Sequence, residues 1–117
     1  MSMHPFAVLG DPVRRRLVEV LATREHSAGE LVALIGQEFA IGQSAVSQQL
    51  RVLKDEGFAT VRAEGRRRIY GIEPAPLESI GAWIAYYRSF WESALADLDD
   101  EIERGKRERA GSGRTPS

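Results

Sequence analysis

The chain has 117 residues, of which 43% are hydrophobic and 28% are charged, and this length and composition suit one globular domain. It contains no cysteine, which excludes disulfides, thiolate metal sites and cysteine nucleophiles. No apolar run approaches the roughly 18 residues of a membrane span, and the N-terminus lacks the pattern of a leader. We therefore predict a cytoplasmic protein that does not contact a membrane.

The net charge of −1 conceals three segments of different sign. Residues 1–72 carry a net charge of +2, residues 73–104 carry −6, and residues 105–117 carry +3. A chain that is not basic overall can bind nucleic acid only through a local cluster of cations. Arg66-Arg67-Arg68 is such a cluster, although an arginine triplet is equally typical of a solvated turn.

Asp11 and Pro12 predict the start of a helix of about 12 residues, because aspartate caps free backbone N–H groups and proline suits the first helical position. A short apolar helix that ends at Gly10 is expected before it. The first two turns of the longer helix contain Arg14-Arg15-Arg16, a charge that the dipole does not favour at that end. We expect these arginines to form a solvated face or to lie near a phosphate.

Ser27 and Glu30 have the spacing of a capping box, which predicts the start of a second helix. We expect this helix to end at Gly36 or soon after, so that residues 37–42 form a connection. A third helix is predicted from Gln43 to Glu56. Two short helices joined by a turn are common, so the pattern alone indicates little about function.

The third helix, closed by Gly57, is predicted to have two distinct faces. Val46, Leu50 and Leu53 form its inward face when residues are placed about 100° apart. A second stripe contains only amides, hydroxyls and one guanidinium group, and its members are Gln43, Ser44, Ser47, Gln48 and Arg51. These groups hydrogen-bond base edges and phosphates. A solvated helix face is the alternative, but such a face usually includes carboxylates, which this stripe lacks.

Residues 59–64 and 67–72 predict two strands joined by a turn at Gly65. A hairpin directly after two helices joined by a turn is typical of a winged helix-turn-helix protein. The tip and second strand of this wing contain the arginine triplet, which can there meet a phosphate backbone. We predict a mainly helical fold with one β-hairpin, in which the third helix and the wing bind double-stranded DNA.

A long amphipathic helix is predicted from about Leu77 to Arg104. Its apolar residues repeat at intervals of three and four, which is a heptad seam, and further aromatic residues widen the seam. A domain this small cannot cover so wide a stripe, so we predict a homodimer; an intramolecular core helix is the alternative. Residues 1–104 form the predicted DNA-binding and dimerisation domain, and residues 105–117 a disordered basic tail. The residues expected at the dimer interface are Phe6, Leu9, Ile80, Trp83, Ile84, Tyr87, Trp91 and Leu98.

Three segments of the chain resemble the ArsR-type winged-helix transcriptional regulators. They are residues 9–21 (LGDPVRRRLVEVL), 43–57 (QSAVSQQLRVLKDEG) and 65–70 (GRRRIY), in the order of that family. The resemblance implies a homodimeric repressor of a palindromic operator, with its own promoter as one expected site. Gly42 stands where the family usually has serine or threonine, and the connection before it looks longer than usual. Glycine caps a helix more weakly than serine or threonine, and the longer connection, residues 37–41, bears on the angle of the third helix.

Metal-sensing members of that family use cysteine pairs or clusters of histidine and carboxylate. Only His4 and His26 occur here, on unrelated segments, so we predict no metal site and no cofactor. One alternative is a carboxylate metal site at the acidic helix end, formed by Asp97, Asp99, Asp100, Glu101 and Glu103. A second is a protein-interaction module on the same fold. No nucleophile with a base, phosphate-binding glycine loop or titratable cluster indicates an enzyme. The sequence does not identify a small-molecule effector.

Overall fold

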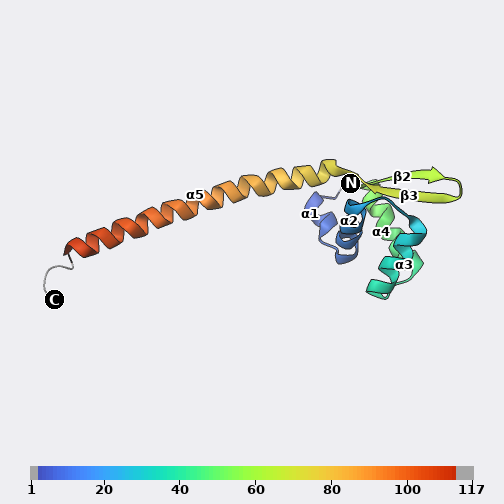
Figure 1. Ribbon diagram of the computed structural model, residues 1–117, viewed down its shortest axis with the longest axis horizontal. Coiled ribbons are helices and arrows are strands. Elements are labelled where there is room, and N and C mark those ends of the chain that lie inside the picture. The colour runs from blue at the N-terminus through green and yellow to red at the C-terminus, as the bar shows by residue number, and fades with distance from the viewer. Residues whose placement is uncertain (1–2, 113–117) are drawn as a thin grey trace. The chain divides into compact units, whose positions relative to one another are not determined.

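The structure is a computed structural model that describes residues 3–112. The predicted mainly helical fold with one hairpin and a long C-terminal helix is confirmed (Figure 1). The chain divides into two units, one that ends at Ile80 and one that begins at Gly81. The assignment of residues 1–104 to one functional domain stays a prediction. In chain order the elements are α1 (Pro5–Leu9), α2 (Pro12–Thr23), β1 (His26–Ser27), α3 (Ala28–Phe39), α4 (Gln43–Asp55), β2 (Ala59–Glu64), β3 (Arg67–Ile72) and α5 (Pro74–Ser112).

The helices α2 and α3 begin at the predicted caps. Asp11 Oδ1 accepts hydrogen bonds from the backbone N–H of Val13 at 2.9 Å and of Arg14 at 3.1 Å. Ser27 Oγ accepts from the N–H of Glu30, and the Glu30 carboxylate accepts from the N–H of Ser27, which completes the capping box. Both starts are therefore set by hydrogen bonds between residues close in sequence.

The connection between α3 and α4 is shorter than predicted. The helix α3 continues past Gly36, and only residues 40–42 separate it from α4. Ala40 adopts the left-handed conformation with φ of 55°, and the N–H groups of Ala40 and Ile41 both donate to the Gly36 carbonyl. A Cβ at position 36 would lie 3.0 Å from the Ile41 carbonyl oxygen, so this glycine permits a close approach of the backbone. The longer connection is wrong because a helix end at alanine lacks the usual glycine signal.

The wing consists of β2 and β3 and turns at Gly65, whose φ of 63° suits a residue without a side chain. The strand β1 was not predicted, because two residues are too few to show alternation. It pairs antiparallel with β3, with His26 opposite Tyr70 and Ser27 opposite Ile69, so the strand order is β1-β3-β2. Since Ser27 also caps α3, this pairing fixes the start of α3 beside the wing.

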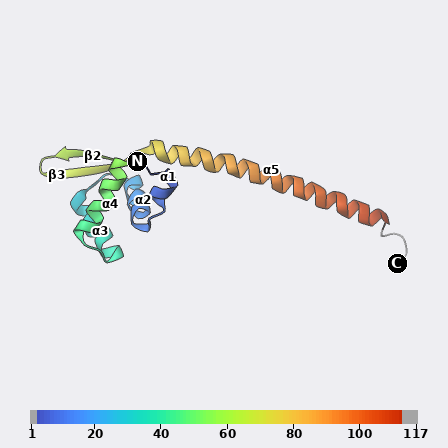
Figure 2. The same ribbon diagram turned by 180° about the vertical axis from the view of Figure 1, so that it is seen from behind.

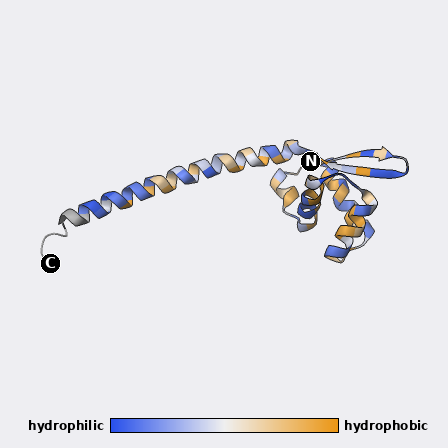
Figure 3. Ribbon diagram, in the orientation of Figure 1, coloured by the Kyte–Doolittle hydropathy of each residue, from blue (hydrophilic) through white to orange (hydrophobic). Residues whose placement is uncertain are grey.

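The first unit has one hydrophobic core, and Figure 3 shows hydrophobic residues along its helices. Its fully buried side chains are Val8, Leu17, Leu21, Leu31, Ile35, Val46, Leu50, Leu53 and Phe58. The predicted inward face of α4 is confirmed, because Val46, Leu50 and Leu53 are at most 1% exposed. Burying one such side chain contributes about 1.5–3 kcal/mol. This burial fixes which face of α4 remains in solvent.

The helix α5 runs without a break in both views (Figure 1 and Figure 2). It starts with Pro74 and Pro76 in its first turn, where a missing N–H group is tolerated. Ile80 is 8% exposed and belongs to the core of the first unit. Among the described residues, no helix is apolar over a stretch long enough to cross a membrane.

The predicted end of this helix at Arg104 is wrong, because residues 105–112 continue it. A single Gly105 costs about 1 kcal/mol relative to alanine and does not stop a helix whose neighbours are good helix formers. Lys106 also lies 3.8 Å from the Glu103 carboxylate, one turn earlier. Residues 113–117 of the predicted tail lie outside the described residues.

Candidate nucleic-acid interface

The polar stripe of α4 is open to solvent. All five of its residues are exposed, and none of their side chains forms a hydrogen bond or ion pair with another residue between 3 and 112. The start of α4 is also open, because Gly42 offers no side chain to cap it and the first turn contains no acidic residue. The stripe and the free N–H groups of the first turn together offer donors to an anionic partner.

A hollow of about 230 Å³ connects the stripe to the wing. Its lining brings Ser47 and Arg51 of α4 together with Arg68 of β3, residues that the sequence only suggested as separate clusters. Lys54, one turn after Arg51, also lines it and was missed because it adjoins two acidic residues in the sequence. The complete lining is Ala28, Ser47, Leu50, Arg51, Lys54, Arg68 and Tyr70. It contains three cations and no carboxylate, which favours a phosphate group.

The three wing arginines differ in their surroundings. Together they line a second hollow of about 440 Å³ beside the start of α3. Arg67 Nη2 lies 3.3 Å from Glu30 Oε1, whereas Arg66 and Arg68 form no ion pair within the described part of the chain. Hydrogen bonds from the backbone and hydroxyl of Ser27, and then the charge of Arg24, hold the pKa of Glu30 below its ordinary value. The charged Glu30 carboxylate therefore pairs with Arg67 and competes with any other anion for it.

The first strand of the wing is held by another arginine. Arg62 Nη2 donates to Glu25 Oε1 at 3.1 Å, and its other terminal nitrogen binds Glu64. The bonds to Glu25 first, and then to Glu64, raise the pKa of Arg62, while Arg62 lowers the pKa of Glu64. Arg62 thus links β2 to Glu25, the residue before β1. Two carboxylates occupy its guanidinium group, whereas Arg68 forms no ion pair within the described part of the chain.

The arginine triplet of α2 is neither a purely solvated face nor a free phosphate site. Arg14 donates to the carbonyls of Val8 at 2.8 Å and Ala7 at 3.2 Å, and Arg15 donates to that of Leu9 at 3.1 Å. These carbonyls lie in the C-terminal turn of α1, where few backbone N–H groups follow; the N–H of Gly10 also donates to the Ala7 carbonyl at 3.2 Å. The sequence argument considered only the dipole of α2 and missed the carbonyls of the preceding helix.

Arg16 completes the triplet by pairing with two carboxylates. Its Nε lies 2.9 Å from Glu38 on α3, and its Nη1 lies 3.3 Å from Glu19 on α2. The Glu38 carboxylate, and then that of Glu19, raise the pKa of Arg16. All three guanidinium groups of α2 therefore serve contacts within the chain.

The residues predicted for a dimer interface lie in different surroundings. Ile80 and Leu9 pack against the core of the first unit, while Phe6 is 38% exposed and stacks on His4 at a ring distance of 5.5 Å. The remaining residues lie on α5 and are exposed: Trp83, Ile84, Tyr87, Trp91 and Leu98. The dimer interface stays a prediction. Because Ile80 is only 8% exposed, this side chain offers little surface to a partner.

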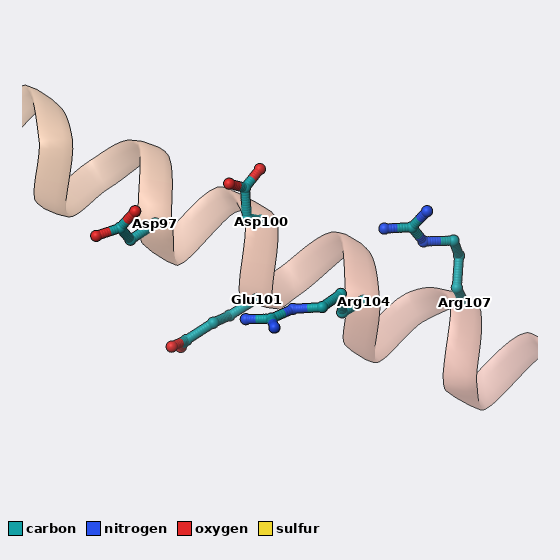
Figure 4. A pocket seen from close by; sticks show the side chains of 5 residues that line it. All are labelled: Asp97, Asp100, Glu101, Arg104 and Arg107. Carbon is teal, nitrogen blue, oxygen red and sulfur yellow. The ribbon is translucent and has the colours of Figure 1, made fainter.

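The acidic end of α5 does not gather into a metal centre. Figure 4 shows three carboxylates, at Asp97, Asp100 and Glu101, which project around one helix with Arg104 and Arg107 following. Among the described residues, no three histidine, aspartate or glutamate side chains come together as metal ligands would.

Both histidines make local contacts. His4 Nδ1 accepts from the N–H of Phe6 and so caps α1, and His26 Nδ1 lies 2.9 Å from the Arg24 carbonyl oxygen.

Comparison with known proteins identifies one family that matches the segment containing α4. Residues 11–61, which contain α2, α3 and α4, match the family described as bacterial regulatory protein, arsR family. The chain is 37% identical over 92 residues to Rv0081 of Mycobacterium tuberculosis, an uncharacterized HTH-type transcriptional regulator, covering 79% of this chain and 75% of the relative.

Solved structures agree with this match. The ArsR-family transcriptional regulator RHA00566 has a TM-score of 0.65 at 26% identity, covering 80% of this chain and 98% of that one. The transcriptional repressor BigR from Xylella fastidiosa has a TM-score of 0.54 at 32% identity, covering 72% and 83%.

Proposed function

Because this chain belongs to the ArsR family of bacterial DNA-binding transcriptional regulators, we propose that it is a homodimeric repressor of a palindromic operator. The observation that carries the proposal is the convergence of Ser47, Arg51 and Arg68 on one hollow without carboxylates. Duplex DNA presents base edges and phosphates side by side, and this surface offers partners for both. The cytoplasm is the compartment that this function requires.

In the proposed complex, α4 lies in the major groove, which is wide enough to admit a helix. The amides of Gln43 and Gln48 pair with base edges, since an amide can donate to and accept from adenine at once. Ser44 and Ser47 bind either bases or the backbone. These side chains need no rearrangement within the protein, because no described residue holds them.

The wing and the end of α4 position the protein on the backbone. Arg66, Arg68, Arg51 and Lys54 neutralise phosphates, which supplies affinity without sequence preference. Arg67 exchanges the Glu30 carboxylate for a phosphate, and an exposed ion pair of this kind is weak enough to be exchanged.

A second copy of the chain covers the apolar stripe of α5. Every large apolar side chain from Trp83 to Ile102 is between 40% and 68% exposed. Burying such a stripe against its symmetry mate contributes about 25 cal/mol per Å² of apolar surface. A two-fold dimer presents two copies of α4 to two half-sites, which is why the operator should be palindromic.

Occupation of such an operator near a promoter excludes the polymerase, and we place one site upstream of the protein's own gene. The similar protein BigR is a repressor, which supports this direction of regulation.

The function is tested by selection from a pool of random-sequence duplexes with the full chain. We expect enrichment of an inverted repeat whose half-sites lie about 34–36 Å apart, protected symmetrically in a footprint. Recovery of duplexes with no common sequence at any salt concentration would contradict sequence-specific recognition and favour a protein-interaction role.

The dimer is tested separately by replacing Tyr87 and Trp91 with alanine. We expect this variant to dissociate at concentrations where the wild type sediments as a dimer, and to lose cooperative binding to paired half-sites. Glu92→Ala is the matched control on the same exposed helix. A wild type that stays monomeric at tens of micromolar while binding the palindrome tightly would show that α5 does not form the dimer.

A further inference from the structure

Two hydrogen bonds join residues 3–14 to α4 and the residue that follows it. Arg14 of α2 donates through Nε to the Val8 carbonyl of α1 at 2.8 Å and through Nη1 to Gln49 Oε1 of α4 at 2.9 Å. At the C-terminal end of α4, Glu56 Oε2 accepts from the N–H of Met3 at 2.8 Å. The position of α4 is therefore linked to α1 by hydrogen bonds as well as by the apolar core.

Arg14 is suited to maintain a fixed geometry between these helices. Its guanidinium group is planar, so the directions of its donors are fixed relative to one another. Val8 has no exposed surface, and the backbone that presents its carbonyl is therefore anchored in the core. Arg14 itself is partly buried, which reduces the competition from water.

Gln49 lies between the polar stripe of α4 and Arg14. It follows the exposed Gln48 of the polar stripe, yet its own side chain is partly buried and bound to Arg14. Holding this side chain limits rotation of α4 about its axis, and that rotation sets the direction of Gln48. Base-edge hydrogen bonds tolerate little misalignment, because they weaken steeply once the donor angle falls below about 120°.

We propose that Arg14 is a positioning residue that does not touch DNA and that fixes the orientation of α4 from α1, thereby determining which bases the protein prefers. The proposal rests on the proposed function, in which α4 reads the duplex. It predicts a loss of sequence preference without a loss of phosphate contacts.

The test compares Arg14→Met with Arg15→Met, in which the neighbouring arginine loses only its bond to the Leu9 carbonyl. For a duplex selected by the wild type, R14M should bind about tenfold more weakly, the effect of one hydrogen bond to a charged group. Its affinity for a scrambled duplex and its salt dependence should match the wild type, because no phosphate contact is lost. R15M should retain both affinities.

Gln49→Met supplies the second half of a double-mutant cycle. If Arg14 acts through Gln49, R14M and Q49M together should reduce the specific affinity no more than either alone. Additive losses would overturn the proposal. So would a fall in both affinities with a salt slope shallower by about one, since Arg14 would then contact a phosphate.

A readout without DNA separates this proposal from the proposed function. In the free protein, the backbone amide resonances of α4 should shift in R14M and stay in place in R15M. A wild type that selects no duplex would refute the proposed function alone, and the resonances would still test the link. If R14M is less stable yet shows unchanged α4 resonances and selects the same sequence, Arg14 is merely structural and the proposal fails.

If R14M does not fold, Arg14→Lys replaces it. Lysine keeps the charge but cannot bridge acceptors on two helices with a rigid fork. Altered base preference in folded R14K supports the proposal, and unchanged preference overturns it.

Discussion

Two arginine triplets in this chain look alike in sequence and differ in what the fold offers them. The guanidinium groups of Arg14-Arg15-Arg16 are taken up by carbonyls of α1, by Gln49 and by carboxylates of α2 and α3. In Arg66-Arg67-Arg68 only Arg67 has a partner among the described residues, and that partner is one exposed carboxylate. The availability of an arginine to DNA is thus decided by the acceptors that neighbouring elements present.

The largest expected effect comes from removing the two wing arginines that form no ion pair among the described residues. Replacing Arg66 and Arg68 with alanine should weaken specific and non-specific duplex binding by similar factors, on the order of tenfold or more for each lost phosphate contact. The salt dependence should become shallower by nearly two units. Titrations of a selected and a scrambled duplex over a salt series measure both quantities.

The control for this prediction is Arg15→Ala with Arg16→Ala, which removes equal charge from α2. Because those groups serve contacts within the chain, this variant should keep the salt dependence of the wild type. An equal reduction in both double variants would show that net charge, and not the place of the arginines, governs binding.

A second prediction separates reading from positioning on the backbone. Gln48→Ala should cost about 1–3 kcal/mol at one operator position in each half-site while leaving non-specific affinity nearly unchanged. Gln37→Ala removes the same exposed amide from α3 and should alter neither. Binding to a series of single-base operator variants measures the effect. Uniform loss across all variants would assign Gln48 to the backbone.

A third and smaller effect concerns the capping box of α3, which Ser27 forms with Glu30, the partner of Arg67. Ser27→Ala removes the side-chain cap of α3 and should lower the free energy of unfolding by about 1 kcal/mol. The exposed Ser79→Ala on α5 is the control and should change little. Urea denaturation followed by circular dichroism gives the comparison, and equal stability of the two variants would contradict the role of the capping box.

The smallest expected effect is a dependence on pH. The Ser27 N–H and hydroxyl hold the pKa of Glu30 below its ordinary value, so the charged carboxylate is favoured in the folded state. This stabilisation is complete above the unfolded pKa of about 4.3 and is lost as the pH falls through the folded pKa. Glu30→Gln keeps a residue that can complete the capping box but does not titrate.

Between neutral pH and about pH 3, the melting temperature of the wild type should therefore fall further than that of E30Q. E30Q should also bind DNA slightly more tightly at neutral pH, because Arg67 loses its competing carboxylate. If the melting temperatures of the two proteins fell equally as the pH was lowered, Glu30 would not contribute in this way.

Features that depend on residues close together in the chain were predictable from the sequence alone. Asp11 and the pair of Ser27 and Glu30 begin their helices through hydrogen bonds that span two or three residues. Gly65 supplies the positive φ that the wing requires. The two faces of α4 follow from helical periodicity, and that is why the polar stripe and the buried face were both predictable.

Features that depend on partners distant in the sequence became evident from the tertiary structure. Nothing near Arg14 in the sequence indicates that Gln49 is one of its acceptors, and nothing near Lys54 indicates that it shares a hollow with Arg68. Hydrogen bonds and charge act over a few ångströms, whichever part of the chain brings the groups together. A sequence pattern can therefore identify groups able to bind DNA, while packing determines which of them remain free to do so.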